Sequence, residues 1–359
     1  MIKIVITGSN VEEGLTASLS KAFLKHDCEV VCFDDALSYT NAHRWMRNPI
    51  TDRLLYKFFP KKVQEDFIEI ALREKPDVLL VLKGFYFHPK TIARVKSELP
   101  HTFLFYFNPD NTFNTWHFGN SNTWILRSIP CYNVHLIWGL FLVEQMKKYG
   151  AKRIEYFPFG YDAELHYPIN PGQEEKNMYV AEIAFVGTWD KEREWWLNQI
   201  IDYPFSIWGN SWERANKKLR TKWKRRAVFG NELSKVCNSS KINLNFIRRQ
   251  NIPAHNMRTF ELPACKVFML TTRTEEQNQF FEEGRDFACF STPEELREKL
   301  DYYLPRDELR REMAENAYKK VQGYTYFERV KKILALYAEM KDGMRLKPFN
   351  TPTLFPSQP

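Results

Sequence analysis

Short, continuous apolar runs recur along the chain, and polar or helix-forming stretches separate them. The first series consists of KIVITG (3–8), CEVVCF (28–33), DVLLVLKG (77–84), TFLFYFN (102–108) and NVHLIWG (133–139). A helix is expected near 12–26, and the charged stretch 41–75 is expected to be mostly helical. Apolar strands that alternate with helices predict a parallel sheet covered on both faces. The first half of the chain is therefore predicted to be an α/β domain.

A second series of the same kind follows a stretch that has no periodicity. Residues 166–178 are rich in proline, glycine and polar residues, as a linker should be. Beyond them come EIAFVG (182–187), FSIWG (205–209), KINLNF (241–246), KVFMLT (266–271) and DFACF (286–290). We therefore expect a first domain at 1–168, a linker at 169–180, a second α/β domain at 181–325, a helix at 326–345 and a flexible tail at 346–359.

One segment carries most of the net charge of +8. ERANKKLRTKWKRR, residues 213–226, holds eight basic residues and one acidic residue. It is either a solvated helix face or a site for an anionic partner. The anionic partner would be a charged acceptor, a membrane surface that carries a lipid-linked acceptor, or nucleic acid.

The sequence also indicates a compartment. It has no run of about 20 apolar residues, the length that spans a bilayer, and its amino end lacks a signal-peptide pattern. The six cysteines are scattered and form no CxxC pair, which is typical of reduced thiols. We therefore expect a cytoplasmic protein, or one that is peripheral at the inner membrane surface.

Arg258 and Glu261 are the first candidates for a ligand site. They are three residues apart and share one face if 255–264 is a helical turn. The apolar run 241–246 precedes that turn, which places both at the carboxyl edge of a sheet, where open α/β folds bind ligands. A guanidinium suits phosphate oxygens, and a carboxylate suits ribose hydroxyls. The alternative is an ordinary surface ion pair on an amphipathic helix.

Taken in order, several segments resemble the CgeB-like (spore maturation protein) glycosyltransferases. They include FYFNPDNTF (105–113), YFPFGYDAELHYP (156–168), IAFVGTWDKERE (183–194), VFGNELSKVCNSSKINLNF (228–246) and RTFELPAC (258–265). The resemblance implies the GT-B architecture, in which two Rossmann-like domains face each other across a cleft. The chain departs from the family at Lys266 and Val267, where members usually have glycine.

The resemblance implies an activity as well. A GT-B enzyme would move a sugar from UDP-sugar, or another nucleotide-diphosphate sugar, to a glycan or a lipid-linked acceptor of the cell envelope. The family generally needs no metal, and the sequence has neither a DxD pair at a strand end nor clustered histidines. We therefore expect a metal-independent reaction with no cofactor besides the nucleotide-sugar co-substrate.

The nucleotide-sugar contacts that the resemblance implies lie in the second domain. In related transferases, the loop after the first strand of this domain contacts the phosphates, and here that loop begins with Gly187 and Thr188 and leads to Arg193. Arg193 can equally be a surface charge of the following helix. Glu261 matches the second glutamate of the broader GT-B motif, the ribose ligand, whereas Pro253 stands where the first glutamate would be.

Other candidates surround these. The base is expected near a loop that family members share, made here of Phe229, Gly230 and Leu233. His255 precedes the Arg258 turn and is a candidate for orienting a phosphate or sugar, although a lone histidine is more often structural.

The acceptor side is predicted from the ends of first-domain strands. Asp110 follows an apolar strand in a Pro-Asp-Asn turn and is a candidate general base; the alternative is an aspartate that only stabilises the turn. Gly8 and Ser9 form the first strand-to-helix turn, and Lys83 ends another strand, so all three are candidates for an acceptor or phosphate loop.

Two rival functions remain open at this point. A phage-type DNA-base glycosyltransferase would keep the chemistry, and segment 213–226 would bind the nucleic acid. A non-catalytic nucleotide-sugar-binding scaffold would keep the fold and the ligand but lack turnover.

Overall fold

The computed structural model describes residues 1–42, 61–116 and 120–342, and they divide into two compact α/β units. The first unit comprises residues 1–158 together with the chain from Arg329, and the second comprises Phe159–Glu328. The prediction of two Rossmann-like α/β domains is confirmed. The predicted helix within 41–75 falls partly, and the tail 346–359 entirely, outside the described residues.

The first unit is built on a six-stranded parallel sheet with the order β2-β1-β3-β4-β5-β6. The strands are β1 (Lys3–Thr7), β2 (Glu29–Phe33), β3 (Val78–Leu82), β4 (Phe103–Phe107), β5 (Val134–Ile137) and β6 (Ile154–Tyr156). All five residues of β3 are buried, because helices cover both faces of a parallel sheet. The predicted apolar runs therefore form the strands of this sheet.

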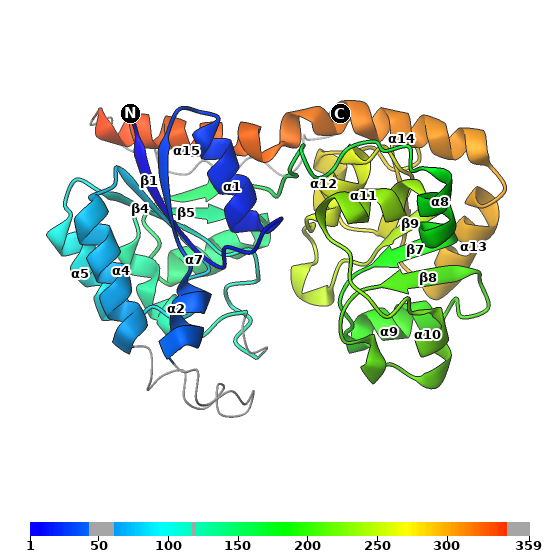
Figure 1. The fold of residues 1–359 in the computed structure, drawn as a ribbon, viewed down its shortest axis with the longest axis horizontal. Helices are drawn as coiled ribbons and strands as arrows, with labels where there is room; N and C mark the ends of the chain where they lie inside the picture. Colours follow the sequence, from blue (N-terminus) through cyan, green and yellow to red (C-terminus); the bar gives the residue numbers. More distant parts are fainter. Residues whose placement is uncertain (43–60, 117–119, 343–359) are drawn as a thin grey trace, which may run out of the picture. The chain divides into compact units, whose positions relative to one another are not determined.

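Within the described residues of the first unit, six α-helices connect these parallel strands. They are α1 (Leu15–Leu24), α2 (Asp35–Ala42), α4 (Lys61–Glu74), α5 (Pro89–Glu98), α6 (Thr123–Ser128) and α7 (Val143–Lys148). Helices α4 and α5 lie side by side on one side of the sheet (Figure 1). Each strand therefore ends at the same edge, and the turns at that edge are the places for a ligand.

The second unit contains a five-stranded parallel sheet with the order β11-β10-β9-β7-β8. The strands are β7 (Ala181–Val186), β8 (Phe205–Trp208), β9 (Ser240–Asn245), β10 (Met269–Thr272) and β11 (Ala288–Phe290). Its core is aromatic: Phe185, Trp196, Trp212 and Phe246 are buried in one cluster. The chain order reverses between β7 and β9, which makes their carboxyl ends the expected ligand edge.

Seven helices among the described residues accompany this sheet. They are α8 (Gln173–Tyr179), α9 (Lys191–Asn198), α10 (Lys217–Lys222), α11 (Gly230–Asn238), α12 (Arg258–Ala264), α13 (Pro293–Tyr303) and α14 (Asp307–Val321). Helices α9 and α10 lie beside each other below β8 in Figure 1. Figure 1 also shows α14 as the long orange helix of this unit.

The prediction of an irregular linker at 169–180 is wrong, because residues 173–179 form α8. The Glu175 carboxylate accepts from the Gly172 N–H at 3.3 Å and pairs with Lys235 of α11 at 2.6 Å. Tyr179 is buried, and its hydroxyl donates to Glu232 at 2.5 Å. Hydrogen bonds and an ion pair with α11 therefore stabilise this short polar segment as a helix.

The boundary between the units also differs from the prediction, because residues 159–168 belong to the second unit. The Tyr161 N–H donates to the Tyr324 carbonyl at 3.1 Å, and the Ser234 hydroxyl donates to the Leu165 carbonyl at 2.8 Å. This segment forms neither a strand nor a helix, so only its tertiary contacts reveal its unit.

The helix expected at 326–345 is α15 (Tyr326–Lys341), and from Arg329 onward it belongs to the first unit. There Lys332 donates to the Tyr156 carbonyl at 2.8 Å, and the Tyr337 hydroxyl donates to Asp77 at 2.5 Å. Ion pairing adds to this anchoring, because Arg153 contacts Glu339 at 2.8 Å.

Candidate functional site

The turn after β7 is held against the turn after β8 by close backbone contacts. The Gly187 N–H donates to the Trp208 carbonyl at 2.9 Å, and the Gly187 carbonyl accepts from Trp212 Nε1 at 2.8 Å. A Cβ on Gly209 would lie 1.9 Å from that carbonyl oxygen, and Gly209 has a φ of +153°. Side chains other than hydrogen are therefore excluded at Gly209.

Gly187 itself meets a similar constraint. A Cβ there would lie 2.8 Å from the Phe185 ring and 3.4 Å from Cζ of Arg193. We predicted that this glycine lets the backbone approach a ligand. The structure shows that packing within the unit already requires it.

Asp190 connects arginines that follow two neighbouring strands, β7 and β9. Its Oδ1 accepts from the Arg193 N–H at 2.8 Å at the start of α9, and its Oδ2 accepts from Arg248 Nε at 2.8 Å. The Arg193 side chain also donates from Nη1 to the Thr188 carbonyl at 2.7 Å. The predicted residues Thr188 and Arg193 thus lie together at the expected ligand edge, together with Arg248, which the sequence analysis missed.

Positive charge accumulates at this edge. Burial, followed by the positive charge of Arg248, lowers the pKa of Arg193 to about 10, and Arg258 acts in the same direction. Within the described residues, the buried Nε atoms of Arg193 and Arg258 have no hydrogen-bond partner. Burial destabilises the charged form of a guanidinium, and an Nε–H without an acceptor adds to the cost. An anion bound nearby would neutralise the charge and accept the hydrogen bond.

Arg258 and Glu261 lie one turn apart in α12 and form an ion pair, with Arg258 Nη1 donating to Glu261 Oε2. Glu261 is only 5% exposed, so this is not the surface pair of the alternative interpretation. Burial disfavours both charged forms, but the attraction between the two outweighs it. The pKa of Glu261 is therefore lowered and that of Arg258 is raised. Both groups are charged near neutral pH.

Three further buried polar residues surround Glu261. Nε2 of His166 lies 3.9 Å from Glu261 Oε1. Burial raises the pKa of Tyr326, and the negative charges of Glu261 and Asp162 add to the effect. Among the described residues, Asp162 Oδ2, His166 Nδ1 and the Tyr326 hydroxyl have no hydrogen-bond partner. Unsatisfied polar atoms around one buried carboxylate indicate a place for polar groups of a ligand or for water.

The sequence contains a signal for two of these residues that was not used. Asp162 and His166 lie in YFPFGYDAELHYP, one of the segments that carries the family resemblance. The expected boundary at residue 168 assigned that segment to the other domain, so neither side chain was considered beside Glu261.

The remaining four residues predicted for the donor site differ in their exposure to solvent. His255 is fully buried, and its ring packs edge-on against Phe159 and Phe260, so its place is in packing rather than in ligand contact. Leu233 is 1% exposed and likewise packs inside. The burial of both side chains disfavours direct contact with a ligand, and both roles stay predictions. Phe229 is exposed, whereas Gly230, which begins α11 beside it, is buried.

The first unit has a pocket of about 470 Å³ at the carboxyl ends of β1, β3 and β4. Its lining includes Gly8, Ser9, Thr16, Asp35, Lys83 and Pro109. The three residues predicted for an acceptor or phosphate loop thus line one pocket. It lies beside the β1–β3 junction, where the strand order of this sheet reverses.

Asp110 lies next to the pocket and is paired with Lys83. Lys83 Nζ donates to Asp110 Oδ2 at 2.6 Å, and both side chains are about one-third exposed or less. Lys83 has a left-handed φ of +63°, uncommon for a residue with a side chain, and its N–H donates to the Phe107 carbonyl at 2.8 Å. The Asp110 N–H also donates to Asn108 Oδ1 at 3.0 Å, as in the predicted turn.

A second carboxylate lines the pocket directly. Asp35 follows β2 at the start of α2 and is buried. Burial, followed by the charge of Asp34, raises the pKa of Asp35 to about 7. A carboxyl group that titrates near neutrality suits general acid–base chemistry. The sequence signal was its place two residues after the apolar run 28–33, which the sequence analysis did not use.

Half of the eight basic side chains in 213–226 lie over aromatic rings of the second unit. They are Arg214 over Trp189, Lys222 over Phe205, Lys224 over Trp208 and Arg226 over Tyr179. Such cation–π contacts stabilise the fold of the segment. The other four, Lys217, Lys218, Arg220 and Arg225, are exposed and make no such contact with a described residue, so they are the first candidates to meet an anionic partner.

In the described part of the chain, His, Cys, Asp and Glu form no group of three or more that would hold a metal ion. Its helices are also too short or too polar to cross a membrane.

Residues 191–335 match the model of a family described as glycosyl transferase-like. A comparison with curated protein sequences finds no match. Solved structures similar in fold include sucrose-phosphate synthase of Thermosynechococcus elongatus, with 11% identity and a TM-score of 0.69 over 96% of this chain and 100% of that chain. Anabaena HepE in complex with UDP-glucose has 11% identity and a TM-score of 0.63 over 96% and 100%. A glycosyltransferase of Rickettsia africae has 15% identity and a TM-score of 0.61 over 94% and 98%.

The solved structures share the fold of this protein, with the two Rossmann-like units of GT-B proteins, and residues 191–335 are similar to glycosyl transferases. The matched segment contains α9, β9 and α12. It therefore includes Arg193, Arg248 and the Arg258–Glu261 pair.

Proposed function

We propose that the protein transfers a sugar from a nucleotide-diphosphate sugar to an acceptor hydroxyl, and that the second unit binds the donor. The observation that carries this proposal is the group of Arg193, Arg248 and Arg258 at the carboxyl edge of its sheet. Only the carboxylates of Asp190 and Glu261 pair with these guanidiniums in the described residues. Three positive charges against two negative ones leave a net positive site that a diphosphate would neutralise.

The arginines suggest how the reaction is assisted. Cleavage of the sugar–phosphate bond leaves negative charge on the diphosphate, and fixed guanidiniums stabilise that charge without reorganising. Because these cations supply the positive charge, we keep the proposal that the reaction needs no metal and no further cofactor. Full activity in excess EDTA would support it, and activity restored only by a divalent cation would contradict it.

The ribose is assigned to Glu261, with Asp162, His166 and Tyr326 around it. The Oε1 atom of Glu261 is not used by the pair with Arg258, in which Oε2 takes part. An oxygen in this position can accept from a ribose hydroxyl. Gly187, Thr188 and the Phe229–Gly230 turn complete the proposed donor site, with the exposed ring of Phe229 available to the base.

The proposed acceptor site is the pocket of the first unit. Lys83 and the Gly8–Ser9 turn line it, and Asp110 is retained as the candidate base that takes the hydroxyl proton. An acceptor with anionic groups, such as a lipid-linked glycan of the cell envelope, would suit the Lys83 ammonium. The CgeB-like assignment rests on the ordered segments that carry the resemblance.

A DNA-base acceptor is the second candidate, favoured only by the exposed cations of 213–226. A steep decrease in duplex binding with salt would support it. Our preference for a glycan acceptor follows from the aromatic contacts that occupy half of those cations.

The donor assignment is tested by thermal unfolding with UDP, UDP-glucose and other nucleotide sugars. A ligand that binds the folded state stabilises it by RT ln(1 + [L]/Kd). A free ligand concentration of about 100 times Kd therefore adds about 2.7 kcal/mol to the free energy of unfolding. We expect at least one of these compounds to raise the melting temperature of the wild type. The absence of stabilisation by every nucleoside diphosphate and nucleotide sugar tested would end the proposal.

A further inference from the structure

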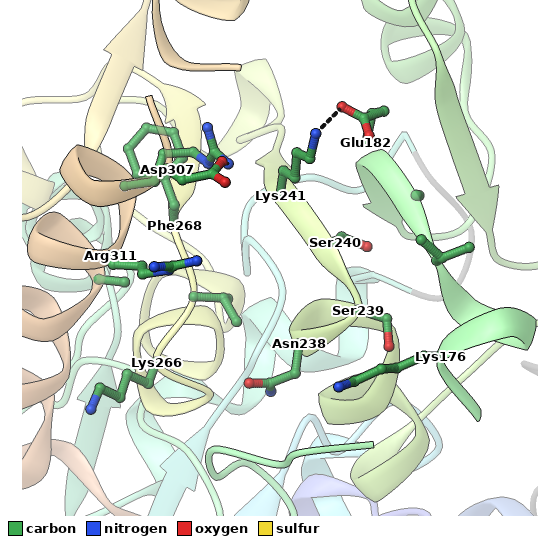
Figure 2. A pocket seen from close by; sticks show the side chains of 15 residues that line it. Lys176, Glu182, Asn238, Ser239, Ser240, Lys241, Lys266, Phe268, Asp307 and Arg311 are labelled. Carbon is green, nitrogen blue, oxygen red and sulfur yellow. Dashed lines mark hydrogen bonds and ion pairs between the residues drawn. The ribbon is translucent and has the colours of Figure 1, made fainter. Parts of the chain in front are cut away.

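A second pocket, of about 420 Å³, opens at the amino end of the sheet in the second unit (Figure 2). It borders the first residues of β7 and β9, and helices α8 and α14 supply its side walls. The strands are parallel, so this edge is opposite the one that holds Arg193 and Arg248. β9 has six residues, which separates the two edges by roughly 20 Å. The pocket is therefore separate from the proposed donor site.

The pocket has an excess of positive charge. Five cations line it, Lys176, Lys241, Lys266, Arg310 and Arg311, against the two carboxylates Glu182 and Asp307, a net charge of +3. Three of these cations are already paired. Lys241 contacts Glu182 at 2.8 Å, Lys266 contacts Glu315 at 2.5 Å, and Arg310 pairs with Asp307.

The other two cations of the pocket are Lys176 and Arg311. Within the described residues, neither side chain forms an ion pair or a hydrogen bond. Figure 2 shows Lys176 reaching inward from α8 on one side and Arg311 from α14 on the other, whereas Lys241 is turned to Glu182. Both residues are exposed, and an anion between them would meet one cation from each wall of the pocket.

The base of the pocket adds hydrogen-bonding and apolar surface. The Ser239 hydroxyl is buried there and has no hydrogen-bond partner among the described residues. A buried hydroxyl without a partner is rare in folded proteins, and a bound oxyanion would accept from it. Val180, Val267 and Phe268 supply apolar surface for the rest of a ligand.

We propose that this pocket binds a small phosphomonoester, with the phosphate between Lys176 and Arg311 and within reach of the Ser239 hydroxyl. A phosphomonoester carries a charge of about −1.5 to −2 at pH 7, which matches the two unpaired cations. A monocarboxylate would neutralise only one of them. The volume is also within the range of about 300–1,000 Å³ that small-molecule sites occupy.

The test is isothermal titration calorimetry at constant ionic strength with glycerol 2-phosphate as the probe. The variant K176A/R311A removes both unpaired cations, and K148A/R127A is the matched control. The control also removes one lysine and one arginine from exposed positions, and so changes the net charge equally. We expect K176A/R311A to weaken binding at least tenfold and the control to stay within twofold of the wild type.

Several results would overturn the proposal: no binding to the wild type, an equal loss in both double variants, or acetate binding as tightly as glycerol 2-phosphate. A Ser239→Ala variant provides a further check, because it should weaken probe binding while leaving the unpaired cations in place. UDP titrated into the same proteins separates this pocket from the donor site. K176A/R311A should bind UDP as the wild type does, so failure of UDP binding in every protein would count against the proposed function alone.

Discussion

Arg248, which follows β9, donates from Nε to Oδ2 of Asp190, which follows β7, at 2.8 Å. This bond spans the point where the strand order of the second sheet reverses. Asp190 also accepts from the backbone N–H of Arg193, and its Oδ2 lies 3.6 Å from Arg193 Nε, so one carboxylate contacts two guanidiniums. Ligands bind at such reversal points because the loops on either side diverge and leave a crevice.

Arg248→Ala is expected to weaken UDP binding about tenfold, or roughly 1.4 kcal/mol, because one of three guanidiniums is lost from the diphosphate site. Isothermal titration calorimetry measures the change. Arg249→Ala is the matched control, since Arg249 is the adjacent and exposed arginine. Equal effects of the two substitutions would show that general surface charge, rather than the position of Arg248, attracts the nucleotide.

Glu261→Ala is expected to destabilise the protein by about 3–5 kcal/mol, because it leaves the buried Arg258 without its counter-charge. The double variant Arg258→Met/Glu261→Leu should recover most of this loss, since both buried charges are then absent. Urea unfolding gives the stabilities. The double variant should still fail to bind UDP; a folded double variant with wild-type UDP affinity would exclude this pair from the donor site.

The raised pKa of Asp35 predicts that the stability of the protein depends on pH. Its folded pKa of about 7 lies above the ordinary value of about 4, so the folded state retains a proton that the unfolded state releases. Asp35 therefore lowers the stability progressively as the pH rises from about 4 to about 7, by up to roughly 1.4 kcal/mol for each unit of pKa difference. Asp35→Asn should gain stability over the wild type across this interval in urea unfolding. A constant difference between pH 4 and pH 8 would contradict the raised pKa.

Asp110→Asn is expected to slow sugar transfer by about 100-fold or more while leaving the thermal stabilisation by UDP unchanged. The reason is that the amide cannot take a proton from the acceptor hydroxyl, whereas the donor site lies in the other unit. Lys83→Ala tests whether the 2.6 Å pair positions the carboxylate. Normal turnover in Asp110→Asn would exclude it as the base and direct attention to Asp35, the other carboxylate at this pocket.

Gly209→Ala is expected to cost roughly 2–4 kcal/mol, because the new Cβ would collide with the Gly187 carbonyl at a backbone φ that only glycine adopts readily. Thermal unfolding measures the loss. Gly172→Ala is the control, since a Cβ there would meet nothing within 4 Å and the substitution should change little. The loss of stability should be accompanied by weaker UDP binding, because the loop that leads to Arg193 is displaced.

The sequence predicted the strands of both sheets well because a fully buried parallel strand is apolar along its whole length. β3 and β4, for example, lie within the predicted runs 77–84 and 102–108. The helix turn that holds Arg258 and Glu261 was also predictable, since a spacing of three residues defines one helical face. Segments 159–168 and 173–179 were misassigned because their structure depends on contacts with distant residues rather than on periodicity.

The sequence by itself determined two α/β units, their strands, and which candidate residues follow the ends of strands. Tertiary structure alone decided which of those residues share a site. It brought Arg248 to Asp190, surrounded Glu261 with Asp162, His166 and Tyr326, and enclosed His255 among aromatic rings. The physical reason is that apolar periodicity is a local property that one segment can reveal. Burial, unsatisfied hydrogen bonds and charge repulsion arise only when segments far apart in the chain are packed together.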